Sequence, residues 1–320
     1  MTKTLIVGIP AFNEAETIYT TIKTIHQEIE AIENVSGTIL VVNDGSTDDT
    51  AALAEQAGAT VISHNVNSGV GIAFQSMISY CLEAKTDYLV TIDADGQFDP
   101  TQISALLAPL MAGKAVMVTG NRFTANEARP KFMSKAKYIG NKIVARIVSK
   151  LVAKDFKDVS CGFRAYSQEA LLHLNLHGKF TYTQETFINL SLKKLPIISV
   201  PVRVKYFEDR KSRVVKSIAD YALNSGLIIL RTYRDFEPMR FFIAIASFWG
   251  MIGLITGGFS VIRFILYSAF SPYLFVVFVA AFCIAFSIIF LIVALVADMY
   301  SRLNRNQERL LYLMKKAHYK

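Results

Sequence analysis

The sequence predicts an α/β domain with a mainly parallel sheet flanked by helices, followed by two C-terminal transmembrane helices. Short runs rich in β-branched residues alternate with helical patterns up to about residue 120, and this alternation is typical of a sheet covered on both faces. Two runs without a charged residue, 241–262 and 264–297, then follow. Each run exceeds the roughly 20 residues that cross a bilayer as a helix.

The elements of the domain follow one another at regular intervals. Strands are predicted where short apolar runs end at turn-forming residues, and helices where apolar residues recur at helical spacing. In such a sheet, ligands bind outside the carboxyl ends of the strands. The expected strands are 4–9, 37–43, 59–63, 88–92 and 115–120, and the expected helices are 14–33, 47–56, 72–83 and 100–110.

A basic segment, 131–157, is predicted to form an amphipathic helix. It carries eight Lys or Arg against one acidic residue, while Ile139, Ile143 and Ile147 recur at helical spacing. Its charges are explained either by a solvated helix face or by contact with anionic lipid headgroups. Nucleic acid is not expected as a partner, because no recognition motif accompanies the charge.

Basic residues flank the two uncharged runs at their outer ends, and the turn beyond Arg263 has none. The positive-inside rule therefore predicts a multi-pass protein of the cell membrane with both termini and the globular domain in the cytoplasm. Two spans enclose little volume, which leaves homo-oligomer formation open. The expected divisions are a globular domain over 1–216, an amphipathic juxtamembrane helix over 217–240, transmembrane helices over 241–263 and 272–297, and a basic tail over 298–320.

Polar and acidic residues follow three of the predicted strands, in the segments 10–14 (PAFNE), 43–50 (NDGSTDDT) and 93–97 (DADGQ). Because parallel strands end at one edge of the sheet, these segments are expected to converge. Crowded carboxylates repel one another, so the third segment is explained either by a solvated turn or by a divalent cation that holds a substrate phosphate. No GxGxxG follows the first strand, which disfavours a dinucleotide-binding fold.

Six segments resemble, in order, the motifs of family-2 glycosyltransferases of the GT-A fold: PAFNEAETI, VVNDGSTDDT, NSGVGIAF, TIDADGQFDP, GNRF and DVSCGFRAYS. The resemblance covers residues 4–216 by motif and the two spans by architecture, and it is strongest to polyprenyl-phosphate glycosyltransferases of the dolichol-phosphate mannose synthase type. It implies inverting, metal-dependent transfer of a sugar from a UDP- or GDP-sugar to an undecaprenyl- or dolichyl-type phosphate in the bilayer. The alternative is a membrane-anchored glycosyltransferase that extends a hydroxyl group of a polysaccharide or glycolipid.

The resemblance assigns the nucleotide-sugar donor to the first two acidic segments. Glu14 would accept a hydrogen bond from the ribose or base, and Asp44 would accept one from an N–H on the base edge. Phe12 stands where the family usually has Tyr, which keeps a contact surface and loses the hydroxyl. The expected donor-binding residues of these segments are Pro10, Ala11, Phe12, Glu14, Val42 and Asp44.

The third segment carries the family's DXD-type motif and the Gln that follows it. Asp95 and Gln97 would bind Mg²⁺ or Mn²⁺ through oxygen, and Asp93 would reach the ribose or a metal-bound water. The cation would hold the diphosphate of the donor as the sugar leaves. Ala94 lies between the two carboxylates and completes the motif.

The remaining assignments concern phosphate groups and the acceptor. Arg122 in GNRF and Arg164 in CGFR are expected to contact phosphate. Glu185 stands where the family has an acidic residue near the reacting sugar. A shortened form of the family's Arg-x-x-Gly-x-Ser-Lys stretch, without its Gly, supplies three residues expected to hold the acceptor phosphate: Arg210, Ser212 and Arg213.

Overall fold

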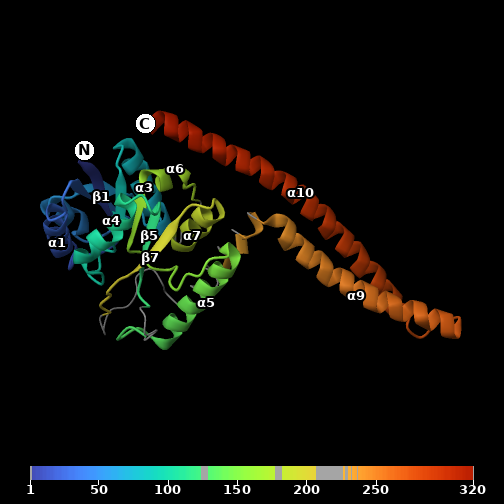
Figure 1. The fold of residues 1–320 in the computed structure, drawn as a ribbon. Coiled ribbons are helices and arrows are strands. Elements are labelled where there is room, and N and C mark those ends of the chain that lie inside the picture. Colours follow the sequence, from blue (N-terminus) through green and yellow to red (C-terminus); the bar gives the residue numbers. More distant parts are fainter. Residues whose placement is uncertain are drawn as a thin grey trace. The chain divides into compact units, whose positions relative to one another are not determined.

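The computed structural model describes residues 2–123, 129–176, 182–206, 226–227, 230–231, 233–235 and 237–319 (Figure 1). The chain divides into two compact units. The first is an α/β unit that reaches Ile229 and also includes the chain from Leu311 onward, and the second comprises Leu230–Leu310. Most of the expected juxtamembrane helix, 217–240, lies outside the described residues.

The described part of the α/β unit contains a seven-stranded sheet with the order β3-β2-β1-β4-β6-β5-β7. Strand β6 runs antiparallel to both of its neighbours, β4 and β5, and the other pairs are parallel. The predicted fold class is therefore confirmed, with one antiparallel strand inside the sheet. The strands are β1 (Lys3–Ala11), β2 (Val35–Asn43), β3 (Thr60–Ser63), β4 (Tyr88–Thr91), β5 (Met117–Asn121), β6 (Arg164–Ser167) and β7 (Ile197–Pro201).

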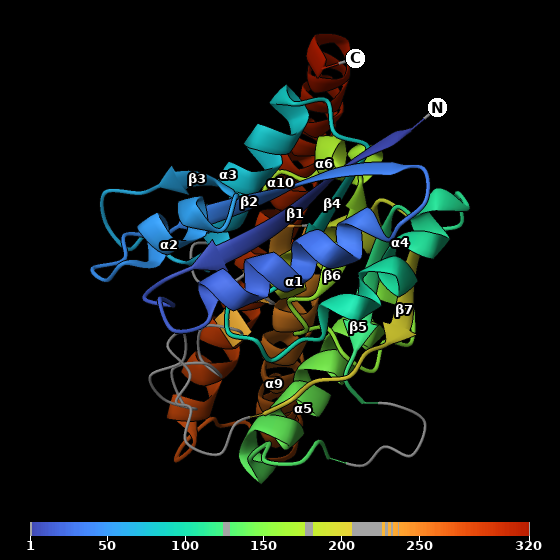
Figure 2. The same cartoon turned by 90° about the vertical axis from the view of Figure 1, so that its left-hand side faces the viewer.

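Alternate side chains of the central strands enter two separate apolar clusters, because successive residues of a strand point to opposite faces. Leu5 and Val7 of β1 belong to one cluster, and Ile6 between them belongs to the other. Helices α1 (Ile18–Glu30) and α4 (Ile103–Met111) cover the first face, as Figure 2 shows. The second face is covered by α3 (Val70–Glu83), α5 (Lys135–Val152), α6 (Gln168–His173) and α7 (Thr183–Leu192).

Two helices begin later than the sequence pattern suggests, because the residues before them form loops at the sheet edge. Residues 15–17 form a turn instead of the expected first helical turn, so α1 starts at Ile18. Helix α2 (Thr50–Gln56) likewise starts after the loop that follows β2. A 3₁₀ turn, η1 (Pro100–Gln102), precedes α4, and its N-cap is Asp99, which accepts a hydrogen bond from the Thr101 N–H.

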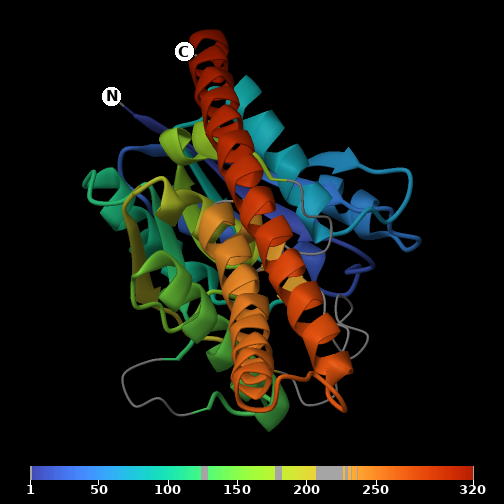
Figure 3. The same ribbon diagram turned by 90° about the vertical axis from the view of Figure 1, so that its right-hand side faces the viewer.

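The second unit contains α9 (Pro238–Tyr267) and the part of α10 (Leu274–Tyr319) up to Leu310, and these two helices pair side by side (Figure 3). Gly253 permits their close approach, since a Cβ there would lie 2.8 Å from Ile284 Cγ1. The Ser287 hydroxyl donates a hydrogen bond of 2.8 Å to the Ala246 carbonyl. Both helices are long and apolar enough to cross a membrane by length and composition. Helix α10 also continues through residues 298–319, which the sequence suggested as a tail.

The end of α10, beyond Leu311, packs within the α/β unit against α6. The ring of Tyr312 stacks on His173 with centroids 4.1 Å apart, and its hydroxyl donates a 2.7 Å hydrogen bond to Glu169. The Lys315 ammonium donates to the Leu174 carbonyl at 3.1 Å. These last turns of α10 are therefore part of the packing of the α/β unit.

Candidate active site

The loops after β1, β2 and β4 meet at the carboxyl edge of the sheet, as the sequence predicted. The Asp44 N–H donates to the Ala11 carbonyl at 2.8 Å and joins the first two loops. The Thr17 hydroxyl donates to the Ala94 carbonyl at 2.9 Å and joins the first loop to the third. These links hold all three acidic segments together at one edge of the sheet.

The first loop is fixed by Asn13. Its side-chain oxygen accepts a hydrogen bond of 2.8 Å from the Thr47 N–H, while its own N–H donates to the Ser46 hydroxyl at 2.9 Å. The left-handed backbone at Asn13 turns the chain so that Glu14 follows with 9% of its surface exposed. Phe12 is half-buried beside it, so both predicted donor contacts keep some accessible surface.

Asp44 lies at the centre of a compact hydrogen-bond network after β2. One of its oxygens lies 2.7 Å from His64 Nδ1 and accepts from the Ser68 N–H at 3.0 Å, and the other accepts from the Gly69 N–H at 2.7 Å. The second ring nitrogen of His64 lies 3.0 Å from the Ser76 hydroxyl. Asp44 is 4% exposed, so any base contact would use the small part of this carboxylate that remains accessible.

The loop 66–69 approaches Asp44 closely because residue 45 is glycine. Gly45 has a φ of +73°, and a Cβ on it would lie 2.6 Å from the carbonyl carbon of Val66. The turn NDG in the sequence therefore has a structural reason in addition to its expected role. It brings the backbone N–H groups of Ser68 and Gly69 onto the Asp44 carboxylate.

Val42, which the family resemblance places among the donor-binding residues, has a buried side chain. This side chain is 0% exposed and belongs to the apolar cluster beneath α3, so the predicted donor contact would have to use the backbone of Val42. Its role here is to pack the sheet against that helix. Ala11 and Ala94 are also buried, at 3% and 2%, so they are able to meet a ligand mainly through their backbone.

Asp93 and Asp95 form a pair of carboxylates after β4. Burial raises the pKa of Asp93, and the charge of Asp95 raises it further. Gly162 makes room for this side chain, because a Cβ there would lie 3.1 Å from Asp93 Oδ1. Asp95 Oδ1 accepts a hydrogen bond of 3.0 Å from the Gln97 N–H, which closes the DADGQ turn.

These residues fit a divalent cation. Burial and the charge of Asp95 both raise the pKa of Asp93, and a bound cation would offset both effects. Carboxylate and amide oxygens are the ligands that Mg²⁺ and Mn²⁺ prefer. Among the described residues, no group of three or more His, Cys, Asp or Glu side chains is placed to hold a metal. Asp95 and Gln97 would thus need oxygens of a substrate phosphate to complete the coordination.

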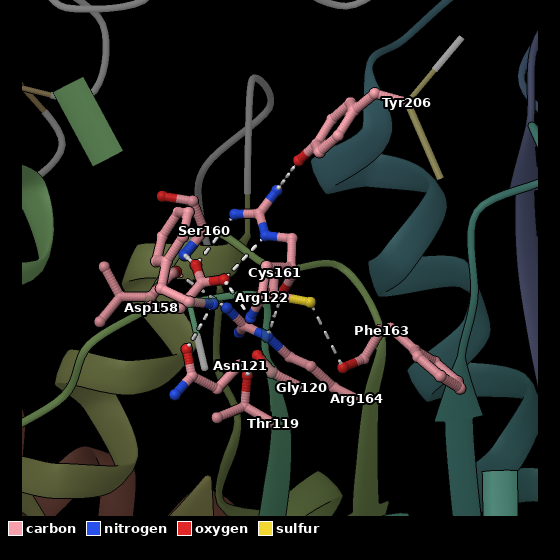
Figure 4. A network of polar contacts seen from close by, with 12 residues as sticks. Thr119, Gly120, Asn121, Arg122, Asp158, Ser160, Cys161, Phe163, Arg164 and Tyr206 are labelled. Carbon is pink, nitrogen blue, oxygen red and sulfur yellow. Dashed lines mark hydrogen bonds and ion pairs between the residues drawn. The ribbon is translucent and has the colours of Figure 1, made fainter. Parts of the chain in front are cut away.

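Arg122, at the end of β5, is held by Asp158 (Figure 4). Its Nε and Nη2 donate to the two carboxylate oxygens at 2.7 and 2.9 Å, and its Nη1 donates to the Tyr206 hydroxyl at 3.3 Å. Only 8% of the Arg122 side chain and none of the Asp158 side chain is exposed. The guanidinium is therefore fixed in one orientation, and its charge partly offsets the rise in the pKa of Asp93 that burial and Asp95 cause.

Lys137, in the first turn of α5, is a second cation near the carboxylate pair. Its ammonium lies 5.3 Å from the centre of the Tyr206 ring. Lys137 is exposed as a residue, but the partial desolvation of its ammonium and the charge of Arg122 lower its pKa, while Asp95 and Asp93 act in the opposite direction. Two cations and two carboxylates thus interact electrostatically at this site. The two cations are suited to bind the phosphate of a substrate.

Arg164 requires a correction. It was expected to contact phosphate, but it is 0% exposed, and its guanidinium donates to three backbone carbonyls and to the Thr186 hydroxyl. Its distance to the Cys161 carbonyl is 2.7 Å, and this contact belongs to the network in Figure 4. Arg164 therefore holds the chain before β6 against the start of α7, and no accessible donor remains for a phosphate.

Helix α7 begins beside the carboxylate pair. Tyr182 stacks on Phe74 with ring centroids 3.9 Å apart, and its hydroxyl donates to the Gly162 carbonyl at 3.4 Å. Burial is the main reason that the pKa of Tyr182 is raised, and the charge of Asp93 contributes. Glu185 follows within the first turn and is half-buried. The predicted acceptor residues Arg210, Ser212 and Arg213 lie outside the described residues.

Four residues of this site were not identified from the sequence. His64 directly follows β3, so the rule about strand ends could have found it. Asp158 is the first residue of the motif DVSCGFRAYS, which also offered a signal. No signal in the sequence pointed to Lys137 or Tyr206, because their proximity to Arg122 depends on how α5 and the chain after β7 pack.

The family of the chain follows from a comparison with known proteins. A profile described as "Glycosyl transferase family 2" matches residues 6–174, which is more than half of the 320 residues. The chain belongs to glycosyltransferase family 2. It is a glycosyltransferase with the GT-A fold, followed by two candidate membrane spans.

Several relatives extend this result. Glycosyltransferase AglJ of Haloferax volcanii is 30% identical over 226 residues, which cover 70% of this chain and 69% of the relative. UDP-N-acetylglucosamine–dolichyl-phosphate N-acetylglucosaminyltransferase of Methanococcus voltae is 28% identical, covering 70% of this chain and 94% of the relative. Polyprenol monophosphomannose synthase of Mycolicibacterium smegmatis is 28% identical, covering 55% and 66%.

Solved structures share the fold. Glucosyl-3-phosphoglycerate synthase from Mycobacterium tuberculosis, in complex with Mn²⁺, UDP-glucose and phosphoglyceric acid, superposes with a TM-score of 0.56. The sequence identity is 22%, and the match covers 72% of this chain and 79% of that chain. At this identity, the likeness supports the architecture of the α/β unit alone.

Proposed function

We propose that this glycosyltransferase moves a sugar from a nucleoside diphosphate sugar to a polyprenyl phosphate in the membrane, with the help of a divalent cation. The observation that carries the proposal is the juxtaposition of the Asp93 and Asp95 carboxylates with the cations of Arg122 and Lys137 at one edge of the sheet. The names of two relatives support the choice of acceptor, because one contains dolichyl phosphate and the other polyprenol monophosphomannose.

The donor would lie across the loops after β1, β2 and β4. Glu14 and Asp44 would accept hydrogen bonds from the nucleoside, and Asp95 and Gln97 would hold the cation that binds the diphosphate. When bound, this cation would neutralise the charge that develops on the departing diphosphate. Asp93 would hold the ribose or a water on the cation.

The acceptor phosphate would meet Arg122 and Lys137. Arg122 suits this role because Asp158 fixes its guanidinium, so that little conformational entropy remains to be lost on binding. The ammonium of Lys137 lies close enough to share the same phosphate region. Arg210, Ser212 and Arg213 would extend this surface, and Glu185 would border the reacting sugar.

The proposed reaction does not depend on a general base to activate the acceptor. A phosphate monoester has its second pKa near about 6 and is therefore largely ionised at neutral pH. One of its oxygens would form a bond to the anomeric carbon while the bond from this carbon to the diphosphate oxygen breaks. Attack opposite the leaving group would invert the configuration. The side chains would mainly align the two substrates and exclude water.

A panel of donors tests the proposal. The detergent-solubilised full chain would be given undecaprenyl or dolichyl phosphate, Mg²⁺ or Mn²⁺, and in turn UDP-glucose, UDP-N-acetylglucosamine and GDP-mannose. We expect one donor to yield a lipid-linked monosaccharide with inverted configuration. Transfer only to a glycan or glycolipid hydroxyl would contradict the proposal and support the alternative acceptor class.

A further inference from the structure

The outer face of α5 carries an apolar stripe that the fold leaves exposed. Ile139, Ile143 and Ile147 are 55%, 48% and 43% exposed. The stripe that the sequence pattern revealed is therefore turned away from the protein core. The buried face of the helix is formed by other residues, namely Asn141, Val144, Ala145 and Val148.

A row of cations runs next to this stripe. Residues four apart lie on one side of a helix, so Lys142, Arg146 and Lys150 form a row that adjoins the three isoleucines. Arg146 and Lys150 are exposed. No acidic residue occurs between Arg129 and Lys154, so nothing on the helix itself offsets this charge.

The combination of an apolar stripe and a cationic row identifies the partner by its chemistry. A helix that is merely solvated has no reason to expose isoleucine at three successive turns. Anionic lipid headgroups complement the cations, and the boundary of the acyl chains receives the isoleucines. Phe132, which is 62% exposed just before α5, adds an aromatic side chain of the kind found at this boundary.

We propose that the outer face of α5 rests on an anionic lipid surface. This inference deepens the proposed function and rests on it for its catalytic meaning. The first turn of the same helix carries Lys137, whose ammonium interacts electrostatically with the carboxylates of Asp93 and Asp95. Contact between α5 and lipid thus places the proposed phosphate site at the level of the headgroups, where the phosphate of a polyprenyl chain lies.

A fluorescence experiment tests the contact without any need for activity. The full chain carrying Ile143→Cys would be labelled with an environment-sensitive dye and placed in nanodiscs with anionic lipid and a quencher attached to the acyl chains. Val66→Cys is the matched control, because Val66 is also apolar and 68% exposed but lies in the loop after β3. The native cysteines, Cys81, Cys161 and Cys283, are buried.

We expect blue-shifted emission and lipid quenching for the label at residue 143 and neither effect for the label at residue 66. Neutral nanodiscs should reduce the quenching, because the cations then lose their partners. Unquenched emission at residue 143 in anionic nanodiscs would overturn the proposal. A blue shift without quenching would also overturn it, because a protein surface such as a second copy of the chain would then cover the helix.

An activity measurement tests the consequence for the acceptor. Replacing the three isoleucines by serine should raise the KM for a long-chain polyprenyl phosphate in anionic liposomes about tenfold and leave the KM for the donor unchanged. The matched variant with three leucines should behave as the wild type. Equal acceptor KM values for the serine and leucine variants would contradict the proposed consequence. A chain without transferase activity would refute the proposed function while the quenching result still decides the lipid contact.

Discussion

Arg122 and Asp158 form a bidentate ion pair from which solvent is almost excluded, with N–O distances of 2.7 and 2.9 Å. Removing one partner of such a pair leaves a buried charge without compensation, which costs about 3–5 kcal/mol. We therefore expect Asp158→Asn to lower the free energy of unfolding by roughly 3 kcal/mol, since Asn keeps part of the hydrogen bonding. Chemical denaturation of the detergent-solubilised chain, followed through the α/β unit, measures this loss.

The neighbouring ion pair between Lys157 and Asp155 provides the control. Both of these side chains are mostly exposed, and exposed pairs contribute only about 0–1 kcal/mol. Asp155→Asn should therefore change stability little. If both variants lower the free energy of unfolding by the same amount, burial does not strengthen the ion pair between Arg122 and Asp158, and our account of this pair is wrong.

The same pair predicts a dependence of stability on pH. Burial alone would raise the pKa of Asp158, but the charge and hydrogen bonds of Arg122 outweigh it and hold this pKa below its ordinary value. A carboxyl group with a lowered pKa in the folded state stabilises the fold above its unfolded pKa of about 3.9, and this contribution is lost as the pH falls toward the folded value. The stability difference between wild type and Asp158→Asn should therefore be constant near neutral pH and shrink below about pH 4. A difference that persists unchanged at pH 3 would exclude this linkage.

Removal of a cation ligand should stop the reaction and spare the fold. Asp95→Asn would lose the charge that binds the divalent cation, and we expect kcat to fall by at least about a hundredfold with an unchanged melting temperature. Asp99→Asn is the control, because Asp99 caps η1 and Asn is an equally good cap. Turnover that survives in Asp95→Asn, or in wild type with excess EDTA, would disprove metal dependence.

His64 should affect nucleotide affinity through Asp44. Its ring lies between the Asp44 carboxylate and the Ser76 hydroxyl, so it fixes the carboxylate that we expect to contact the base. Asp44→Ala should weaken binding of free nucleotide by about 1.5–3 kcal/mol, and His64→Ala by about 1 kcal/mol. Calorimetry on the two single variants and the double variant measures their coupling. Additive effects would show that His64 acts independently of Asp44.

The contacts of Tyr312 predict a structural role for the end of α10. Tyr312→Phe keeps the stack on His173 and loses the hydrogen bond to Glu169, so it should cost about 1 kcal/mol of stability. Tyr312→Ala should cost more, because it also removes the ring that packs against the core. Melting temperatures of the two variants should follow this order. Equal melting temperatures for wild type and Tyr312→Ala would show that the end of α10 is not held there.

Much of the α/β unit could be predicted because its signals are local. The apolar runs of β1 and β4 and the polar residues that follow them placed three loops at one edge of the sheet, and the structure joins these loops through Thr17 and Asp44. Strands β6 and β7 were not among the predicted strands. The antiparallel direction of β6 depends on the path of the chain between 121 and 164 and not on the composition of the strand.

The sequence was least informative where burial depends on packing. An arginine in a segment that resembles a family motif suggests a ligand contact, but Arg164 satisfies its donors with backbone carbonyls that only the folded chain brings together. The spacing of the isoleucines in α5 correctly predicted a helix with an apolar face. Such a spacing does not show whether that face is buried or exposed. Alternation along β2 turns the side chain of Val42 to the core, so the predicted donor contact would have to use its backbone.

The placement of residues 311–319 against α6 has a consequence for biosynthesis. The ribosome makes this segment after both candidate membrane spans, although α6, against which it packs, lies in the first two thirds of the chain. The α/β unit therefore cannot complete its native packing when its own strands have emerged. The contacts of His173 and Glu169 with Tyr312 form only after α9 and most of α10 have been synthesised. A chain whose translation stops before Tyr312 lacks these contacts and leaves this surface of α6 uncovered.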